Sequence, residues 1–192
     1  MRQPDFYRYF FAFRPDFVLR CWLASLADAA GQRGKRINFH LTLCVIAELQ
    51  HRDCFIASRV HSALASHSLA SCSFWLGRLR GGSNGATVYA MGRQLEIQDF
   101  YRALLACLAE RAIFPLHRKS GLHPHVTLGH DPCAFDPFNL PREWVPEELL
   151  LIESEVGNSV HIVLARWPLL PPRQGAFAFE TPPQLLAAGA GA

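Results

Sequence analysis

Two copies of a four-residue pattern, His-x-Thr-Leu, combine side chains that could do acid–base chemistry. One copy runs over residues 40–43 (HLTL) and the other over residues 125–128 (HVTL). The chain has 9 His and only 4 Thr among its 192 residues. Chance alone would then give roughly 0.2 His-x-Thr pairs. The repetition therefore indicates that both copies have a function.

The spacing within each copy suits a β-strand. Positions i and i+2 of a strand point to the same face, so His40 lies beside Thr42 and His125 lies beside Thr127. The intervening aliphatic residues point to the opposite face, toward a core. Two such strands across a groove would bring two imidazoles and two hydroxyls into one space.

That set of groups suits metal-free phosphodiester chemistry. Histidine titrates near neutral pH, so one ring can be neutral while the other is protonated. The neutral ring accepts a proton from the attacking water, and the charged ring protonates the departing oxygen. The threonine hydroxyls can donate to the non-bridging phosphate oxygens. The competing interpretation is a half-buried histidine bonded to its own threonine, which suffices for one copy but explains two poorly.

The elements that must position these residues follow from periodicity and turn signals. Strands are expected near residues 7–13, 39–49, 74–79, 86–91, 123–130, 149–152 and 160–167, and helices near 17–30, 56–69 and 97–108. Asn84-Gly85 predicts a hairpin turn. The order strand, helix, basic glycine-containing loop and His-x-Thr strand occurs twice. We therefore expect an α+β fold with an internal pseudo-repeat.

Charge is divided unevenly along the chain. Residues 1–130 carry a net charge of +8 and residues 131–192 a net charge of −5, within the overall +3. This indicates either a solvated acidic surface on the last third or a basic working face for an anionic ligand.

Compartment and domain organisation follow from composition. The six cysteines are scattered without a CxxC pair, no apolar run approaches the ~20 residues of a membrane span, and the N-terminus does not read as a signal peptide. We expect a reduced cytoplasmic protein. Residues 1–170 would form one domain, and residues 171–192, rich in Pro, Ala and Gly, an extended or disordered tail.

The two four-residue patterns, called tetrads below, resemble those of the two-histidine (2H) phosphoesterase superfamily, in its bacterial 2′-5′ RNA ligase or RNA 2′,3′-cyclic phosphodiesterase branch. The YRYFFAFRPD segment at the start, PHVTL in the second half and Trp167-Pro168-Leu169 after a strand add to the likeness, over roughly residues 6–170. The resemblance implies a bilobal fold in which two antiparallel sheets with flanking helices surround a central groove.

The resemblance also implies an activity and roles for the residues. The activity is hydrolysis of ribose 2′,3′-cyclic phosphates, on RNA ends or small nucleotides, to 2′-phosphates, with reverse 2′-5′ ligation as a further possibility. His40 would be the general acid and His125 the general base, while Thr42 and Thr127 would bind phosphate. No metal, no cofactor and a monomer are expected.

The sequence departs from the family after each tetrad, where members often carry a basic residue. Cys44 follows the first tetrad and Gly129-His130 the second. His130 could replace the missing phosphate contact or be a surface histidine. Basic residues in the loops before the tetrads could also compensate: Lys35, Arg36, Arg118 and Lys119.

Two other classes of function remain open from the residues alone. Zinc could be bound by a cluster within eleven residues, which comprises His123, His125, His130 and Cys133. A groove with basic residues and phenylalanines could instead bind an RNA end or a nucleotide without turnover.

Overall fold

Strands and helices alternate along the chain in nearly the order that the sequence patterns predict. The computed structural model describes residues 3–34, 36–116, 121–135 and 138–172. Its elements are β1 (Phe6–Phe13), α1 (Phe17–Ala29), the 3₁₀ helix η1 (Arg36–Asn38), β2 (Leu41–Leu49), α2 (Ile56–Leu64), β3 (Phe74–Gly82), β4 (Gly85–Met91), α3 (Leu95–Ala109), β5 (His125–Gly129), β6 (Phe138–Trp144), β7 (Glu148–Val156) and β8 (Val160–Pro168). The predicted tail lies almost wholly outside the described residues.

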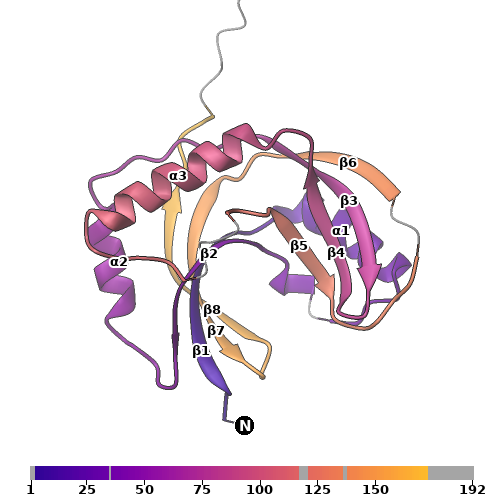
Figure 1. Cartoon of the computed structure of the whole chain (residues 1–192), viewed down its shortest axis with the longest axis horizontal. Helices are drawn as coiled ribbons and strands as arrows, with labels where there is room; N and C mark the ends of the chain where they lie inside the picture. Colours follow the sequence, from indigo (N-terminus) through magenta and orange to yellow (C-terminus); the bar gives the residue numbers. More distant parts are fainter. Residues whose placement is uncertain (1–2, 35, 117–120, 136–137, 173–192) are drawn as a thin grey trace, which may run out of the picture.

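The eight strands form one antiparallel order, β6-β3-β4-β5-β2-β1-β7-β8. Read outward from its centre, each half repeats the other, since β2-β1-β7-β8 mirrors β5-β4-β3-β6. Figure 1 shows these strands as a strongly curved sheet with α2 and α3 on its outer side. The α+β class and the pseudo-repeat are confirmed. Where the resemblance implied two antiparallel sheets, the structure joins the two halves into one eight-stranded sheet, because β2 pairs with β5.

The sequence patterns do not predict β6, because Pro141 lies inside this strand. Proline cannot donate to a strand ladder and is tolerated mainly at sheet edges. β6 is the edge strand beyond β3, and the β3–β6 register shifts between Leu76 and Arg78. Gly77 lies at that shift, where an added Cβ would come within 2.6 Å of the carbonyl oxygen of Leu140.

The main core joins both halves of the sheet. Phe13 of β1 contacts the rings of Phe74, Phe100 and Trp144, with ring centroids 5.0 to 6.5 Å apart. Helix α1 follows β1 in sequence but packs against β5 of the other half. The halves are thus interlocked through the helices, which fixes the relative position of β2 and β5.

β1 is buried on both of its faces. Tyr9, Phe11 and Phe13 belong to the main core, whereas Phe10 and Ala12 form a second apolar cluster with residues of β7. The second cluster lies on the face that also carries the histidines. The residues of this second cluster therefore form the apolar floor of the candidate site.

Local signals set the ends of the helices. The side chain of Asp16 accepts a hydrogen bond of 2.7 Å from the backbone N–H of Leu19 and caps α1. α2 ends at Leu64 rather than near Leu69, because the chain beyond it turns to bond with Leu170, which follows β8.

Candidate active site

The two His-x-Thr-Leu tetrads meet where β2 pairs with β5. Leu41 is the partner of Val126 in this antiparallel pair, and both side chains are fully buried. His40 and Thr42 flank Leu41, and His125 and Thr127 flank Val126, so all four side chains lie on the face away from the main core.

Both histidine rings are oriented by the same backbone contact. The Nδ1 atom of His40 lies 2.6 Å from the carbonyl oxygen of Asn38, and the Nδ1 atom of His125 lies 2.7 Å from that of His123. A carbonyl oxygen only accepts, so each Nδ1 carries the proton and donates it. In the neutral rings Nε2 is left as the basic nitrogen, and it is available for proton transfer.

Aromatic contacts hold the His40 ring in place. Its centroid lies 5.0 Å from that of Phe10 and 5.0 Å from that of His161, the latter ring being edge-on at 75°. In the other half, Tyr89 lies 5.7 Å from His125. Each imidazole thus has an aromatic neighbour, and His40 has a second imidazole beside it.

The electrostatics of His40 are set by its burial. Burial lowers the pKa of His40 below its ordinary value of 6.5, and the positive charges of Arg14 and His125 act in the same direction, while the bond to Asn38 opposes the shift. At neutral pH the free protein therefore holds His40 mainly as a neutral ring that can accept a proton.

A cavity of about 350 Å³ opens beside these groups. It brings together four of the five site residues predicted from the sequence, namely His40, Thr42, Thr127 and His130. The fifth, His125, does not line this cavity but lies on the adjoining strand, where its charge acts on His40. The cavity can hold an anion between hydroxyl donors and an imidazole, as phosphoryl chemistry requires.

Nine further residues, which no sequence pattern predicts, complete the cavity wall. They are Arg8 and Phe10 of β1, Val45 of β2, Ser154, Glu155 and Val156 of β7, Gly157 and Ser159 of the following turn, and His161 of β8. Alternation along β8 could place His161 on one face, but only the strand order shows that this face meets His40.

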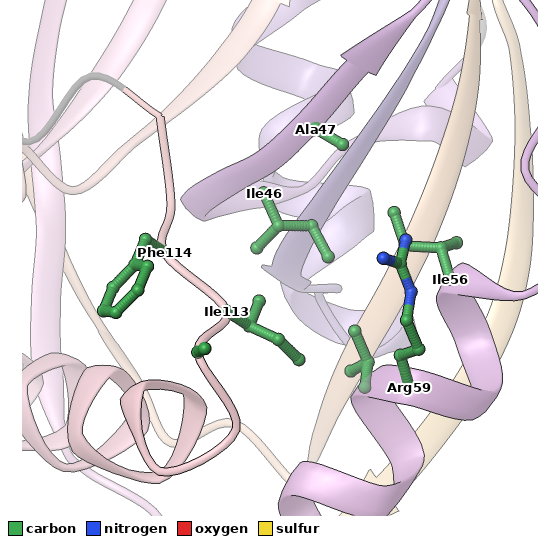
Figure 2. A pocket seen from close by; sticks show the side chains of 8 residues that line it. Ile46, Ala47, Ile56, Arg59, Ile113 and Phe114 are labelled. Carbon is green, nitrogen blue, oxygen red and sulfur yellow. The ribbon is translucent and has the colours of Figure 1, made fainter.

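A second cavity, of about 320 Å³, has a different character (Figure 2). Its lining is aliphatic and aromatic apart from Arg59, whose guanidinium is paired with Asp53 at 2.7 Å. Figure 2 shows Ile46 and Ile113 between Phe114 and Arg59. This cavity contains no acid–base pair and is not the candidate active site.

The chain beside His130 is held by a buried amide. The Gln32 side chain donates from Nε2 to the carbonyl oxygen of Asp131 at 2.8 Å and accepts from the Asp131 N–H at 3.1 Å. A Cβ at Gly129 would lie 2.5 Å from Oε1 and 2.7 Å from Cβ of Gln32, so an added side chain there would displace Gln32. Gln32 thus fixes the end of β5 and the exposed His130 at the edge of the cavity.

Four basic residues were expected to compensate for the absence of a basic residue after each tetrad, and they divide into two sets. Lys35, Arg118 and Lys119 lie outside the described residues. Arg36 donates to the carboxylate of Asp28 at 2.7 Å and to the carbonyl of Gln32 at 2.6 Å. Arg36 therefore supports the loop before His40.

The zinc site considered from the sequence is not formed. Among the described residues, which include His123, His125, His130 and Cys133, no group of three or more His, Cys, Asp or Glu side chains is placed to hold a metal ion. The residues are close in sequence, but β5 is extended and ends in a turn toward Gly82, which accepts from the N–H of Cys133. All six cysteines are described, and none of them forms a disulfide bond.

None of the helices in the described part of the chain is long and apolar enough to cross a membrane.

No protein-family profile matches the chain, and no curated protein matches its sequence. Solved structures match its fold. E. coli LigT complexed with phosphate aligns with a TM-score of 0.64 at 18% identity, over 86% of this chain and 99% of LigT. A phosphoesterase aligns with a TM-score of 0.65 at 19% identity, over 87% and 99%. TT0787 of Thermus thermophilus gives 0.66 at 18% identity, over 84% and 97%.

Proposed function

We propose that this chain, which has the fold of E. coli LigT, is a phosphodiesterase that opens ribose 2′,3′-cyclic phosphates and leaves the phosphate on the 2′ oxygen. One observation carries the proposal. The Leu41–Val126 pair joins the two segments that carry the tetrads as neighbours in one sheet, and each Nδ1 atom is bonded to a backbone carbonyl, which leaves Nε2 for proton transfer. The enzyme would act as a monomer, without a metal or a cofactor.

The reaction adds water across the bond between phosphorus and the 3′ oxygen. Nε2 of His125, as the base, accepts a proton from water while the water oxygen attacks phosphorus. As the bond to the 3′ oxygen breaks, Nε2–H of His40 passes its proton to that oxygen. The hydroxyls of Thr42 and Thr127 donate to the non-bridging oxygens, where negative charge is concentrated in the transition state. These roles of acid and base are those that the family resemblance implies.

The acid role of His40 requires a proton that the free protein holds weakly, because burial lowers the pKa of this ring. A bound cyclic phosphate carries a negative charge, which favours the protonated ring. Substrate binding at neutral pH is therefore coupled to proton uptake by His40. Calorimetric titration in buffers of different ionisation enthalpy measures this uptake directly.

The substrate would be a nucleotide or the 3′ end of an RNA. The structures of E. coli LigT include complexes with 3′-AMP and with ATP, which supports nucleotide-sized anions as ligands for a site of this fold. The basic first two thirds of the chain, with a net charge of +8, favour such a ligand. Reverse ligation to a 2′-5′ linkage would use the same groups in the opposite order.

A panel of 2′,3′-cyclic substrates tests the proposal. Wild type, His40→Ala and His125→Ala are assayed with and without EDTA, and the product isomer is identified. We expect 2′-phosphate products, insensitivity to EDTA and loss of turnover in both variants. Full activity in either variant would refute the acid–base pair. Binding without hydrolysis by wild type would identify a nucleotide-binding protein, and inhibition by EDTA would restore a metal mechanism.

A further inference from the structure

A row of polar residues crosses four strands on the same face as the candidate site. Arg8 pairs with Glu48 of β2 and with Ser154 of β7, and Ser154 pairs in turn with His161 of β8. Arg8, Ser154 and His161 line the same cavity as His40. The row therefore forms a wall of the active-site cavity that the tetrads do not supply.

His161 brings this wall into contact with the catalytic groups. Its ring centroid lies 5.0 Å from that of His40 and 5.9 Å from that of Phe10, so both imidazoles rest on the same apolar floor. The neighbour of His125 in the other half is Tyr89, not an imidazole. His40 thus has a second imidazole as a neighbour, whereas the aromatic neighbour of His125 has no ring nitrogen.

The end of the wall near the β7–β8 turn is tied to the catalytic segment. The Nδ2 atom of Asn38 donates to the carbonyl oxygen of Ser159 at 3.1 Å, while the carbonyl oxygen of Asn38 accepts from His40. One residue therefore holds both the turn and the His40 ring. The wall is a fixed part of the site.

Charge pairing indicates what this part of the cavity would bind. The Nε atom of Arg8 donates to the Glu48 carboxylate at 2.7 Å, and the carboxylate of Glu155 accepts from Arg52 at 2.9 Å. Both charged residues of the cavity lining are thus already paired with opposite charges. Such a surface suits neutral hydrogen-bonding groups, such as ribose hydroxyls and base edges, better than a second phosphate.

We propose that Arg8, Ser154 and His161 form the subsite for the nucleoside part of the substrate, and that the site reads one nucleoside rather than a chain of phosphates. This rests on the proposed function, which places the cyclic phosphate between the tetrads. The cavity of about 350 Å³ is at the lower end of the range of roughly 300–1,000 Å³ for small-ligand sites.

Three substrates separate nucleoside recognition from chemistry at phosphorus. They are adenosine 2′,3′-cyclic monophosphate, the same compound with a 5′-phosphate, and glycerol 1,2-cyclic phosphate, which has no nucleoside. The variant His161→Phe keeps a ring beside His40 but removes the nitrogens. The control is His61→Phe. The ring centroid of His61 lies 6.2 Å from that of Trp167, and His61 is not among the residues that line the cavity.

His161→Phe is expected to raise KM for the adenosine substrate about tenfold, the effect of one lost hydrogen bond, with little change in kcat. The kcat/KM for the glycerol substrate and all values of the control stay at the wild-type level. The 5′-phosphate does not lower KM in wild type. Equal losses on both substrates would show that His161 only positions His40. Such equal losses would overturn the subsite. An unchanged KM of His161→Phe for the adenosine substrate would also overturn it, as would a wild-type KM lowered tenfold or more by the 5′-phosphate.

Failure of the proposed function gives a distinguishable result. If wild type hydrolyses none of the three substrates, calorimetric titration with adenosine 2′-monophosphate decides on the subsite alone. Weaker binding by His161→Phe supports it, and equal binding overturns it. His161→Gln, which keeps a polar side chain, and thermal unfolding of each variant separate a lost contact from misfolding.

Discussion

The Nδ1 atom of His40 donates to the carbonyl oxygen of Asn38 across 2.6 Å. The Nδ1 atom of His125 makes the same bond, across 2.7 Å, to the carbonyl oxygen of His123, which is two residues earlier in the chain. The repeated pattern therefore includes the backbone acceptor as well as the histidine and the threonine. This acceptor decides which nitrogen of each ring can exchange protons with a substrate.

The first prediction concerns that nitrogen. Asparagine at either histidine position keeps an amide N–H near Nδ1 but removes Nε2. His40→Asn and His125→Asn should each lower kcat by about 10²–10⁴-fold, the usual contribution of a general acid or base. The pH profile of kcat/KM should be bell-shaped in wild type and lose one limb in each variant.

A matched control for this prediction is His51→Asn, because His51 is exposed and does not line the cavity. Its profile should match that of wild type. If both limbs persist in either catalytic variant, the pair of histidines does not carry the proton transfers.

The second prediction is a pH dependence of stability that comes from His40. Burial lowers the pKa of His40 below 6.5 in the folded protein, so the unfolded chain binds a proton first as pH falls. The free energy of unfolding should therefore decrease as pH drops from about 6.5 through the lower folded pKa, with no contribution above 6.5. Urea denaturation at pH 7.5 and 5.5 measures the change, and His40→Asn should show a smaller one. An equal change in the two proteins would contradict the burial of a neutral His40.

Much of the fold could be predicted because local patterns agree with the final packing. The Asn84-Gly85 turn, the strand around His125 and the amphipathic helix near residues 97–108 each have a local signal that tertiary contacts reinforce. β6 could not be found in this way, because Pro141 weakens its strand signal and only its edge position makes that proline acceptable.

The candidate site divides in the same way. His40, Thr42 and Thr127 were predicted from the repeated tetrad, since the period of a strand is a local property. Arg8, Ser154 and His161 were not, because each carries no local motif and reaches the cavity only through the order of β2, β1, β7 and β8. The curvature of the sheet (Figure 1) is likewise not predictable from a single-sequence pattern.

A third prediction tests the threonine hydroxyls. Thr42→Val keeps the branched shape of the side chain but removes the donor, so we expect kcat to fall by about 10²-fold, as when one donor to a transition-state oxygen is lost. Thr42→Ser keeps the hydroxyl and should retain most of the activity. Steady-state kinetics on a 2′,3′-cyclic nucleotide provides the comparison. Equal activity of the valine and serine variants would mean that the hydroxyl does not contact the phosphate.

The last prediction concerns the backbone next to His130. Gly85 has a positive φ of 99°, and a Cβ there would lie 2.0 Å from the carbonyl oxygen of Gly129. Nearby Gly82 has nothing within 4 Å of an added Cβ, so it is a matched control in the same hairpin. Gly85→Ala should lower the free energy of unfolding by at least about 2 kcal/mol, because it combines backbone strain with a backbone clash.

Gly82→Ala should change the free energy of unfolding by less than about 1 kcal/mol, as expected for an open position. Urea denaturation of both variants makes the comparison. Where Gly85→Ala still folds, displacement of Gly129 should also shift His130 and weaken phosphate binding, measured by titration with inorganic phosphate. If the two variants were equally stable, β4 would not pack against the end of β5 as closely as the structure shows, and His130 would not be held at the cavity edge by this contact.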